Sequence, residues 1–206
     1  MTGDRIVHVV DDDLAVRQSL AFLLSTAGIA VRVHESARSF LGAPDIANAG
    51  CVITDIRMPE MDGIELQREL NARPQKVPVI VITGHGDVAL AVQAMKAGAV
   101  DFIEKPFDDD ALIGAVLAAL DRRAREAERD AAAAEAAARL GALSERERQV
   151  LDGLLAGQPN KVIAHELGIS PRTVEIHRAN LMTKMRAASL SDLVRLALMG
   201  GATGDG

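Results

Sequence analysis

The sequence predicts an α/β domain with a doubly wound, five-stranded parallel sheet, followed by an all-α domain of four helices that includes a helix-turn-helix. Over the first 120 residues, short apolar runs alternate with helical stretches through short connections, which is typical of a doubly wound sheet. The apolar runs lack polar alternation, as expected for strands buried on both faces. After residue 143 the strand signals disappear, whereas the helical signals continue.

The expected strands lie at 5–10, 29–34, 51–55, 78–83 and 100–104, and the accompanying helices at 13–27, 36–42, 63–72, 87–97 and 108–120. Asp13 is a suitable N-cap for the first helix. Gly28 and Gly98 each follow a helical stretch, where glycine favours the left-handed conformation that ends a helix. Pro78 suits the first position of a strand because it has no N–H to donate to the ladder.

The chain divides into three expected parts: a domain at 1–120, a helical linker at 121–142 and a second domain at 143–206. Residues 122–140 contain strong helix formers and neither glycine nor proline. Nearly all of their apolar side chains are alanine, which buries little area. We therefore expect the linker to be a solvated connecting helix.

In the second domain, helices are expected at 145–155, 160–166, 171–185 and 189–199. Ser144 and Glu147 have the spacing of a capping box, and Ser170 followed by Pro171 pairs an N-cap with the favoured first helical residue. The short link through Gly168 joins two helices in the manner of a helix-turn-helix.

The charge pattern confines any nucleic-acid contact to one segment. The net charge is −6; residues 1–120 carry 17 acidic and 10 basic residues (−7), whereas residues 143–206 carry 7 acidic and 8 basic ones (+1). Residues 170–186 hold four basic residues and one acidic residue, a local charge of +3. A nucleic-acid footprint is therefore expected there.

The single cysteine, Cys51, lies among apolar residues, so we expect a core thiol and a reducing compartment. No apolar stretch reaches membrane-spanning length, so we expect a cytoplasmic protein with no membrane partner. His8, His34 and His165 stand alone in the sequence without metal-ligand spacing, and we assign them no chemistry.

Polar side chains stand at the ends of four expected strands: Asp11 and Asp12 after the first, Asp55 at the third, Thr83 at the fourth and Lys105 after the fifth. The carboxyl ends of parallel strands share one edge, where open α/β sheets bind ligands. Three clustered carboxylates suit Mg²⁺, which prefers oxygen ligands. Asp55 would then act as a nucleophile and form an aspartyl phosphate. Lys105 and the metal would neutralise the phosphoryl oxygens, and Thr83 would donate its hydroxyl to one of them.

Two other functions are compatible with the same residue types. One is an Mg²⁺-dependent phosphatase of the haloacid-dehalogenase type, which also uses an aspartate nucleophile. Such enzymes usually carry a second aspartate two residues after the nucleophile, where this chain has Arg57. The other is a phosphorylation-independent DNA-binding or protein-binding regulator.

Residues 1 to about 120 resemble the receiver domain of bacterial response regulators, through the motifs VVDDD (9–13), VITDIRMPEMDG (52–63), ITGHG (82–86) and FIEKPF (102–107). The resemblance implies strand order 2-1-3-4-5, phosphorylation of Asp55, and a cis peptide before Pro106. It implies that Mg²⁺ is held by Asp11, Asp12, Asp55 and the backbone carbonyl of Arg57. The implied phosphoryl switch consists of Thr83, Lys105 and Phe102, the last at a position where receivers often have tyrosine.

Residues 143 to about 199 resemble the LuxR-type helix-turn-helix, through LSERERQVL (143–151), LAGQPNKVIAHELGIS (155–170) and TVEIHRANLMTKM (173–185). The resemblance implies that Glu175, Ile176 and Ala179 face the bases. Other side chains are expected to contact DNA, largely at phosphates: Lys161, Arg172, Thr173, Arg178 and Lys184.

Together the two parts are similar to the FixJ type of regulator, which implies a transcription activator of nitrogen-fixation genes and not an enzyme, apart from slow autodephosphorylation. The implied partners are promoter DNA, RNA polymerase and a sensor histidine kinase, which in this type is an oxygen-sensing haem kinase. We expect phosphorylation to produce a homodimer through a face that carries Val88, Val92, Met95 and Lys96.

Overall fold

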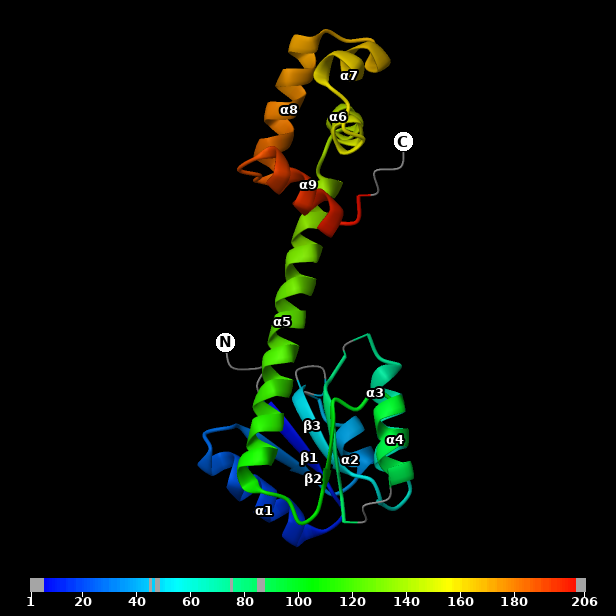
Figure 1. The fold of residues 1–206 in the computed structure, drawn as a ribbon, viewed down its shortest axis with the longest axis vertical. Coiled ribbons are helices and arrows are strands. Elements are labelled where there is room, and N and C mark those ends of the chain that lie inside the picture. The colour runs from blue at the N-terminus through cyan, green and yellow to red at the C-terminus, as the bar shows by residue number, and fades with distance from the viewer. Residues whose placement is uncertain (1–5, 45, 47–48, 75, 85–87, 203–206) are drawn as a thin grey trace. The chain divides into compact units, whose positions relative to one another are not determined.

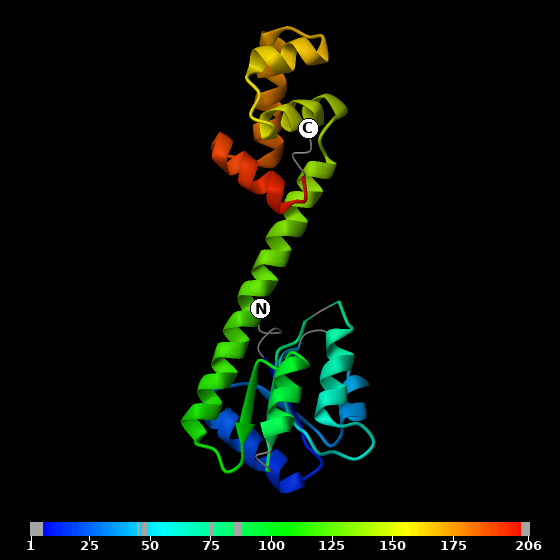
Figure 2. The same ribbon diagram turned by 45° about the vertical axis from the view of Figure 1, so that its right-hand side comes forward.

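The computed structural model describes residues 6–44, 46, 49–74, 76–84 and 88–202 (Figures 1 and 2). The chain forms two compact units, residues 1–126 and 127–206. Within the described residues, no helix is long and apolar enough to cross a membrane.

The first unit is a parallel five-stranded sheet with strand order β2-β1-β3-β4-β5, which confirms the predicted fold class. Its strands are β1 (Ile6–Val10), β2 (Val31–His34), β3 (Ala49–Asp55), β4 (Val79–Thr83) and β5 (Asp101–Glu104). Its helices are α1 (Leu14–Thr26), α2 (Ala37–Leu41), α3 (Gly63–Asn71), α4 (Val88–Lys96) and the beginning of α5 (Asp109–Gly141).

Each face of the sheet has its own hydrophobic core. Ile53 and neighbouring residues of the central strands pack with Leu24 of α1 and Leu112 of α5. The alternate residues, such as Val52, pack on the other face with side chains of α2, α3 and α4, among them Phe40. Successive residues of a strand point to opposite faces, and the central strands are therefore largely apolar on both faces, as the sequence predicts.

Local signals set the element boundaries. The Asp13 side chain accepts hydrogen bonds from the backbone of the first turn of α1, and Gly28 has a φ of 76°, so both predicted ends of α1 are confirmed. The expected strand at 29–34 begins only at Val31. Its first residue, Ile29, donates its N–H to the carbonyl of Leu24 and so still belongs to the turn that ends α1.

His8 and His34 do not stand alone, which corrects the interpretation from their spacing. Parallel pairing of β1 with β2 places His8 Nδ1 2.9 Å from His34 Nε2, with the two rings stacked. Phe40 of α2 packs against both rings. The pair is therefore a partly buried polar contact within the first unit, which the separation of 26 residues along the chain concealed.

The second unit consists of the last part of α5, α6 (Glu145–Leu155), α7 (Asn160–Leu167), α8 (Pro171–Met185) and α9 (Leu190–Met199). The predicted capping box of Ser144 and Glu147 and the predicted N-cap Ser170 are confirmed. Gly168, with a φ of 64°, joins α7 to α8 in the left-handed conformation that the helix-turn-helix prediction requires.

The end of α5 differs from the solvated helix that its alanine content predicts. Ala136 and Leu140 are 1% and 5% exposed, and Leu140 joins the core formed by α6 to α9. The chain at Gly200 comes so close that an added Cβ would lie 2.7 Å from Leu140 Cδ1 and 2.9 Å from the backbone of Ala136. Small side chains at these positions thus permit close packing, which an estimate based on apolar area alone overlooks.

We expect Leu140→Ala to lower the free energy of unfolding of the second unit by about 3 kcal/mol, because it leaves a cavity in a packed core. Leu117→Ala, in the same helix but 49% exposed, should change stability by less than about 0.5 kcal/mol. Denaturant unfolding combined with hydrogen exchange measures both effects, in α6, α8 and α9 for Leu140→Ala and in the first unit, which contains Leu117, for Leu117→Ala. Equal behaviour of the two variants would mean that the end of α5 is solvated.

Candidate functional site

Three charged side chains that are far apart in the sequence meet at the carboxyl edge of the sheet. Asp11 follows β1, Asp55 ends β3 and Lys105 follows β5. Lys105 Nζ lies 3.2 Å from Asp11 Oδ2 and 3.1 Å from Asp55 Oδ1. The carboxylates are 5% and 14% exposed and the lysine side chain 24%. The predicted convergence of these three residues is therefore present in the structure.

Backbone hydrogen bonds hold the two carboxylates in place. Asp11 Oδ1 accepts the N–H of Asp13 at 2.9 Å, and Asp55 Oδ2 accepts the N–H of Arg57 at 2.7 Å. Each aspartate therefore uses one oxygen to fix its own loop and offers the other to Lys105.

Burial and charge act in opposite directions on this group. Burial raises the pKa of Asp11, and repulsion from Asp55 adds to the rise, whereas the hydrogen bond from Asp13 and the charge of Lys105 oppose it. Burial lowers the pKa of Lys105, but its hydrogen bonds and attraction to Asp55 and Asp11 outweigh this, so that the pKa rises overall. Lys105 is therefore firmly cationic at neutral pH.

Thr83 ends β4, between β3 and β5, and is 1% exposed. Its carbonyl accepts the N–H of Lys105 at 2.7 Å, which links these two residues, both predicted to belong to the phosphoryl switch, through the backbone. The peptide bond from Lys105 to Pro106 is cis, as the family resemblance implies. Phe102 of β5 is half-buried and packs on the core next to α4.

The loop after β3 is held close to the start of α3 at Gly63, a position beside the site that analysis of side-chain chemistry missed. Its N–H donates to the carbonyl of Ile56 at 2.9 Å, and an added Cβ would lie 2.3 Å from the carbonyl oxygen of Asp55. Asp62 and Glu65 form a capping box at the start of α3 directly beside it. The Asp-Gly pair that ends the VITDIRMPEMDG motif was the available signal for this close approach.

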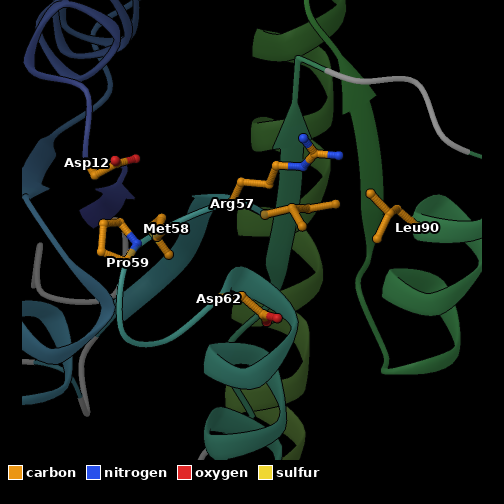
Figure 3. Close-up of a pocket in the computed structure, with 7 residues that line it drawn as sticks. Asp12, Arg57, Met58, Pro59, Asp62 and Leu90 are labelled. Carbon is orange, nitrogen blue, oxygen red and sulfur yellow. The ribbon is translucent and has the colours of Figure 1, made fainter.

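Beside the carboxylates lies an open pocket of about 680 Å³. Figure 3 shows Asp12 and Leu90 on opposite sides of this pocket, with Arg57 between them. Asp12 and Arg57 are both exposed. The remaining lining residues are Ile56, Met58, Pro59 and Asp62.

The oxygen donors predicted for Mg²⁺ are of the type that this ion prefers, but they are only partly gathered. Among the described residues, no three His, Cys, Asp or Glu side chains form a group that could hold a metal ion. Asp11 and Asp55 share Lys105, whereas Asp12 lines the neighbouring pocket. The donor set thus fits Mg²⁺ in its chemistry, with Asp12 still apart from the other two carboxylates.

The face expected to dimerise belongs to α4. Val92 and Met95 are 45% and 49% exposed, and Lys96 is exposed as well. Ala94 points to the core. The side chain of Val88 lies outside the described residues.

In the second unit, α8 presents a mixed polar and apolar surface to solvent. Arg172, Glu175 and Ala179 are exposed, and Ile176 is 55% exposed. The opposite side of α8 is buried through Val174, Leu181 and Met185.

Three further residues expected to contact DNA lie near this surface or at the start of α7. Lys161 is exposed near the start of α7, while Thr173 and Arg178 are half-buried. The Thr173 hydroxyl lies 2.8 Å from the hydroxyl of Ser170 and so takes part in the cap of α8.

Lys184 has a partner within the protein, which the prediction of a phosphate contact did not anticipate. Its Nζ lies 2.7 Å from Glu147 Oε2 and 3.4 Å from the carbonyl of Ala142. The carboxylate of Glu147 is 5% exposed. The sequence marked Glu147 as a capping residue, but nothing in its spacing indicated a partner 37 residues away.

Comparison with known proteins assigns both units. Residues 7–117 match the family model for the response regulator receiver domain, and residues 141–197 match that for bacterial regulatory proteins of the luxR family. The chain is 59% identical over 195 residues to the transcriptional regulatory protein FixJ of Azorhizobium caulinodans, a match that covers 95% of this chain and 92% of the relative.

Two solved structures match nearly the whole chain. Full-length FixJ from B. japonicum is 52% identical with a TM-score of 0.59, over 96% of this chain and 98% of that one. The response regulator StyR is 40% identical with a TM-score of 0.82, over 94% and 98% of the two chains.

We expect Gly63→Ala to destabilise the first unit by about 1–3 kcal/mol, because the added methyl group collides with the backbone of Asp55. Gly114→Ala in α5 is the matched control: no atom lies within 4 Å of its added Cβ, so it should be neutral or mildly stabilising. Denaturant unfolding gives the energies, and the amide chemical shift of Arg57 reports the loop. An unchanged shift and stability in Gly63→Ala would show that the contact is not constraining.

Proposed function

Because this chain belongs to the FixJ-like response regulators, which join a receiver domain to a LuxR-type DNA-binding domain, we propose that phosphorylation of Asp55 switches it on as a transcription activator. The observation that carries the proposal is the geometry around Asp55. Its carboxylate stands at the carboxyl edge of the sheet, 3.1 Å from the ammonium of Lys105 and beside an open pocket.

The proposed donor is a phosphohistidine of a sensor kinase. An oxygen of Asp55 forms a bond to phosphorus, the P–N bond to the histidine breaks, and the leaving imidazole nitrogen takes up a proton. Lys105 neutralises charge on the phosphoryl oxygens. Asp11, Asp12, Asp55 and the carbonyl of Arg57 are the proposed ligands of Mg²⁺, which, when bound, would neutralise the acidic cluster and the phosphoryl oxygens.

The new phosphoryl group brings strong acceptors next to Thr83 and Lys105. These two residues are joined through the backbone, so capture of the phosphoryl group by either is transmitted to β4 and β5. Phe102 on β5 and the face of α4 with Val88, Val92, Met95 and Lys96 form the proposed responding surface. The exposed apolar side chains of Val92 and Met95 support a homodimer contact there.

A dimer would present two copies of α8 to successive half-sites of promoter DNA. Glu175, Ile176 and Ala179 are the proposed base-reading residues, and their exposure supports this role. Lys161, Arg172, Thr173 and Arg178 are proposed to contact the DNA backbone.

In the proposed organisation, residues 121–142 link a receiver domain at 1–120 to a DNA-binding domain at 143–206, with the last turns of the linker packed on the latter. The proposed setting is the cytoplasm, with RNA polymerase as the target of activation. The similarity to FixJ proteins supports an oxygen-sensing haem kinase as the phosphoryl donor and nitrogen-fixation genes as the targets.

The phosphatase alternative is set aside by the family match and by Arg57, which occupies the position of the second catalytic aspartate. A regulator that works without phosphorylation differs from the proposed function in one measurable way, its response to loss of the Asp55 carboxylate.

With acetyl phosphate and Mg²⁺, the wild-type chain should gain the mass of one phosphoryl group and dimerise. Asp55→Asn should do neither, because an amide is not a nucleophile for this transfer. Asp13→Asn is the matched control, since asparagine preserves the N-cap and Asp13 takes no part in the proposed chemistry. Intact mass and light scattering decide. Asp55→Asn that dimerises to the same extent as the wild type, with or without acetyl phosphate, would support a phosphorylation-independent regulator.

Glu175→Gln should change the preferred base at one position in each half-site, because a carboxylate accepts from cytosine N4 and a carboxamide pairs best with adenine. The expected change in discrimination is about 1–3 kcal/mol. Selection from a random duplex pool measures it, with Glu166→Gln on α7 as the control. An unaltered preferred sequence would remove Glu175 from the base-reading set.

A further inference from the structure

Two hydrogen bonds join the C-terminal end of α8 to α5 and α6, whereas side chains at its N-terminal end are exposed. Lys184 Nζ donates to Glu147 Oε2 at 2.7 Å, and Arg139 Nη1 donates to the carbonyl of Met185 at 3.1 Å. From these contacts we infer that Lys184 is a positioning residue that fixes the recognition helix against α6 through Glu147, and not a contact to a DNA phosphate. The inference rests on the proposed role of α8 in reading DNA.

Glu147 is a demanding partner because its carboxylate is buried. Oε2 accepts the backbone N–H of Ser144 at 2.7 Å in addition to the ammonium of Lys184. The pKa of Glu147 is lowered, and the hydrogen bond from Lys184 is the largest cause. Burial acts in the opposite direction and raises the pKa. Removal of Lys184 would therefore leave a buried charge with only its capping bond, an arrangement that costs free energy unless the helices move.

Lys184, which anchors the end of α8, lies far along the helix from the proposed base-reading residues Glu175 and Ile176. Lys184 lies eight residues after Ile176, or about 12 Å along the helix axis. Recognition helices read bases mainly with their N-terminal residues, which in α8 include the exposed Glu175 and Ile176. Lys184 stands in the last turn, where Nζ also reaches the carbonyl of Ala142 at 3.4 Å.

A small tilt of α8 at Lys184 produces a larger displacement at the N-terminal end of the helix. A tilt of about 10° around the last turn would move groups about 12 Å away by about 2 Å, more than the ~0.5 Å within which a binding constellation must be held. Base readout would then suffer, whereas phosphate contacts, which long flexible side chains make, would tolerate the shift. We therefore expect the protein to lose its preference for the selected DNA sequence, while the salt dependence of its affinity stays the same.

The test uses the full-length chain, phosphorylated with acetyl phosphate and Mg²⁺. The probes are a duplex that the wild-type protein selects from a random pool and a scrambled duplex of the same composition. The variants are Lys184→Met, Glu147→Gln and their combination; glutamine keeps an acceptor for the N–H of Ser144. Arg178→Met serves as the reference for a proposed phosphate contact. Affinity is measured over a range of salt concentrations, and thermal unfolding is recorded for each variant.

If Lys184 positions α8, each single variant binds the selected duplex about tenfold more weakly, and the double variant is no worse than either single one. Binding of the scrambled duplex and the salt slope stay at the wild-type values. Arg178→Met, in contrast, lowers the salt slope by about 1.8, because the dimer loses one phosphate contact in each copy and each contact contributes about 0.9. Glu147→Gln is the decisive variant even if Lys184→Met folds poorly, because it removes no positive charge.

The inference is overturned if Lys184→Met lowers the salt slope and weakens both duplexes alike while Glu147→Gln leaves binding unchanged or strengthens it. It is also overturned if Glu147→Gln retains wild-type specificity. Both results presuppose that the wild-type protein prefers its selected duplex. Failure of the wild-type protein to show any preference would overturn the DNA-binding proposal itself, and the inference with it.

Discussion

The contact of one lysine with one buried and one half-buried carboxylate is the constraint on which the receiver unit depends. Lys105 holds Asp11 and Asp55, which come from β1 and β3, while the lysine itself follows β5. Such a meeting requires parallel strands, because their carboxyl ends then share an edge, and Lys105 reaches along that edge past β4, which lies between β3 and β5. The charged contact at the site thus depends on the topology of the sheet.

The charges in this arrangement do not balance, and we expect the imbalance to serve the function of the site. Two carboxylates face one ammonium, and burial raises the pKa of Asp11 against the pull of Lys105. A well-packed apolar cluster would be more stable at the same edge. Gly63 also lowers stability, because glycine is a poor helix former. Only glycine, however, lets the start of α3 approach the carbonyl of Asp55 so closely. We therefore expect the site to respond to a ligand that alters its charge.

The sequence was sufficient for whatever depends on periodicity, caps and strand ends. It predicted the five strands, the helix-turn-helix and the meeting of Asp55 with Lys105, because each has a local signal. It failed where packing between distant segments decides. The contact of His8 with His34, the burial of Ala136 and the pairing of Lys184 with Glu147 all require knowledge of which surfaces touch. No spacing rule encodes such contacts.

The last of these changes the electrostatics of DNA binding. Residues 170–186 have a formal charge of +3, but Lys184 is paired with a buried carboxylate, and Arg186 lies 3.9 Å from Glu135. The segment then offers Arg172 and Arg178 as its cations without a carboxylate partner among the described residues. Affinity rises steeply with the number of phosphates neutralised, so one copy of this segment, even together with Lys161 of α7, offers few cations to hold it on DNA. Two copies double that number, and this gives a physical reason for coupling dimerisation to transcriptional control.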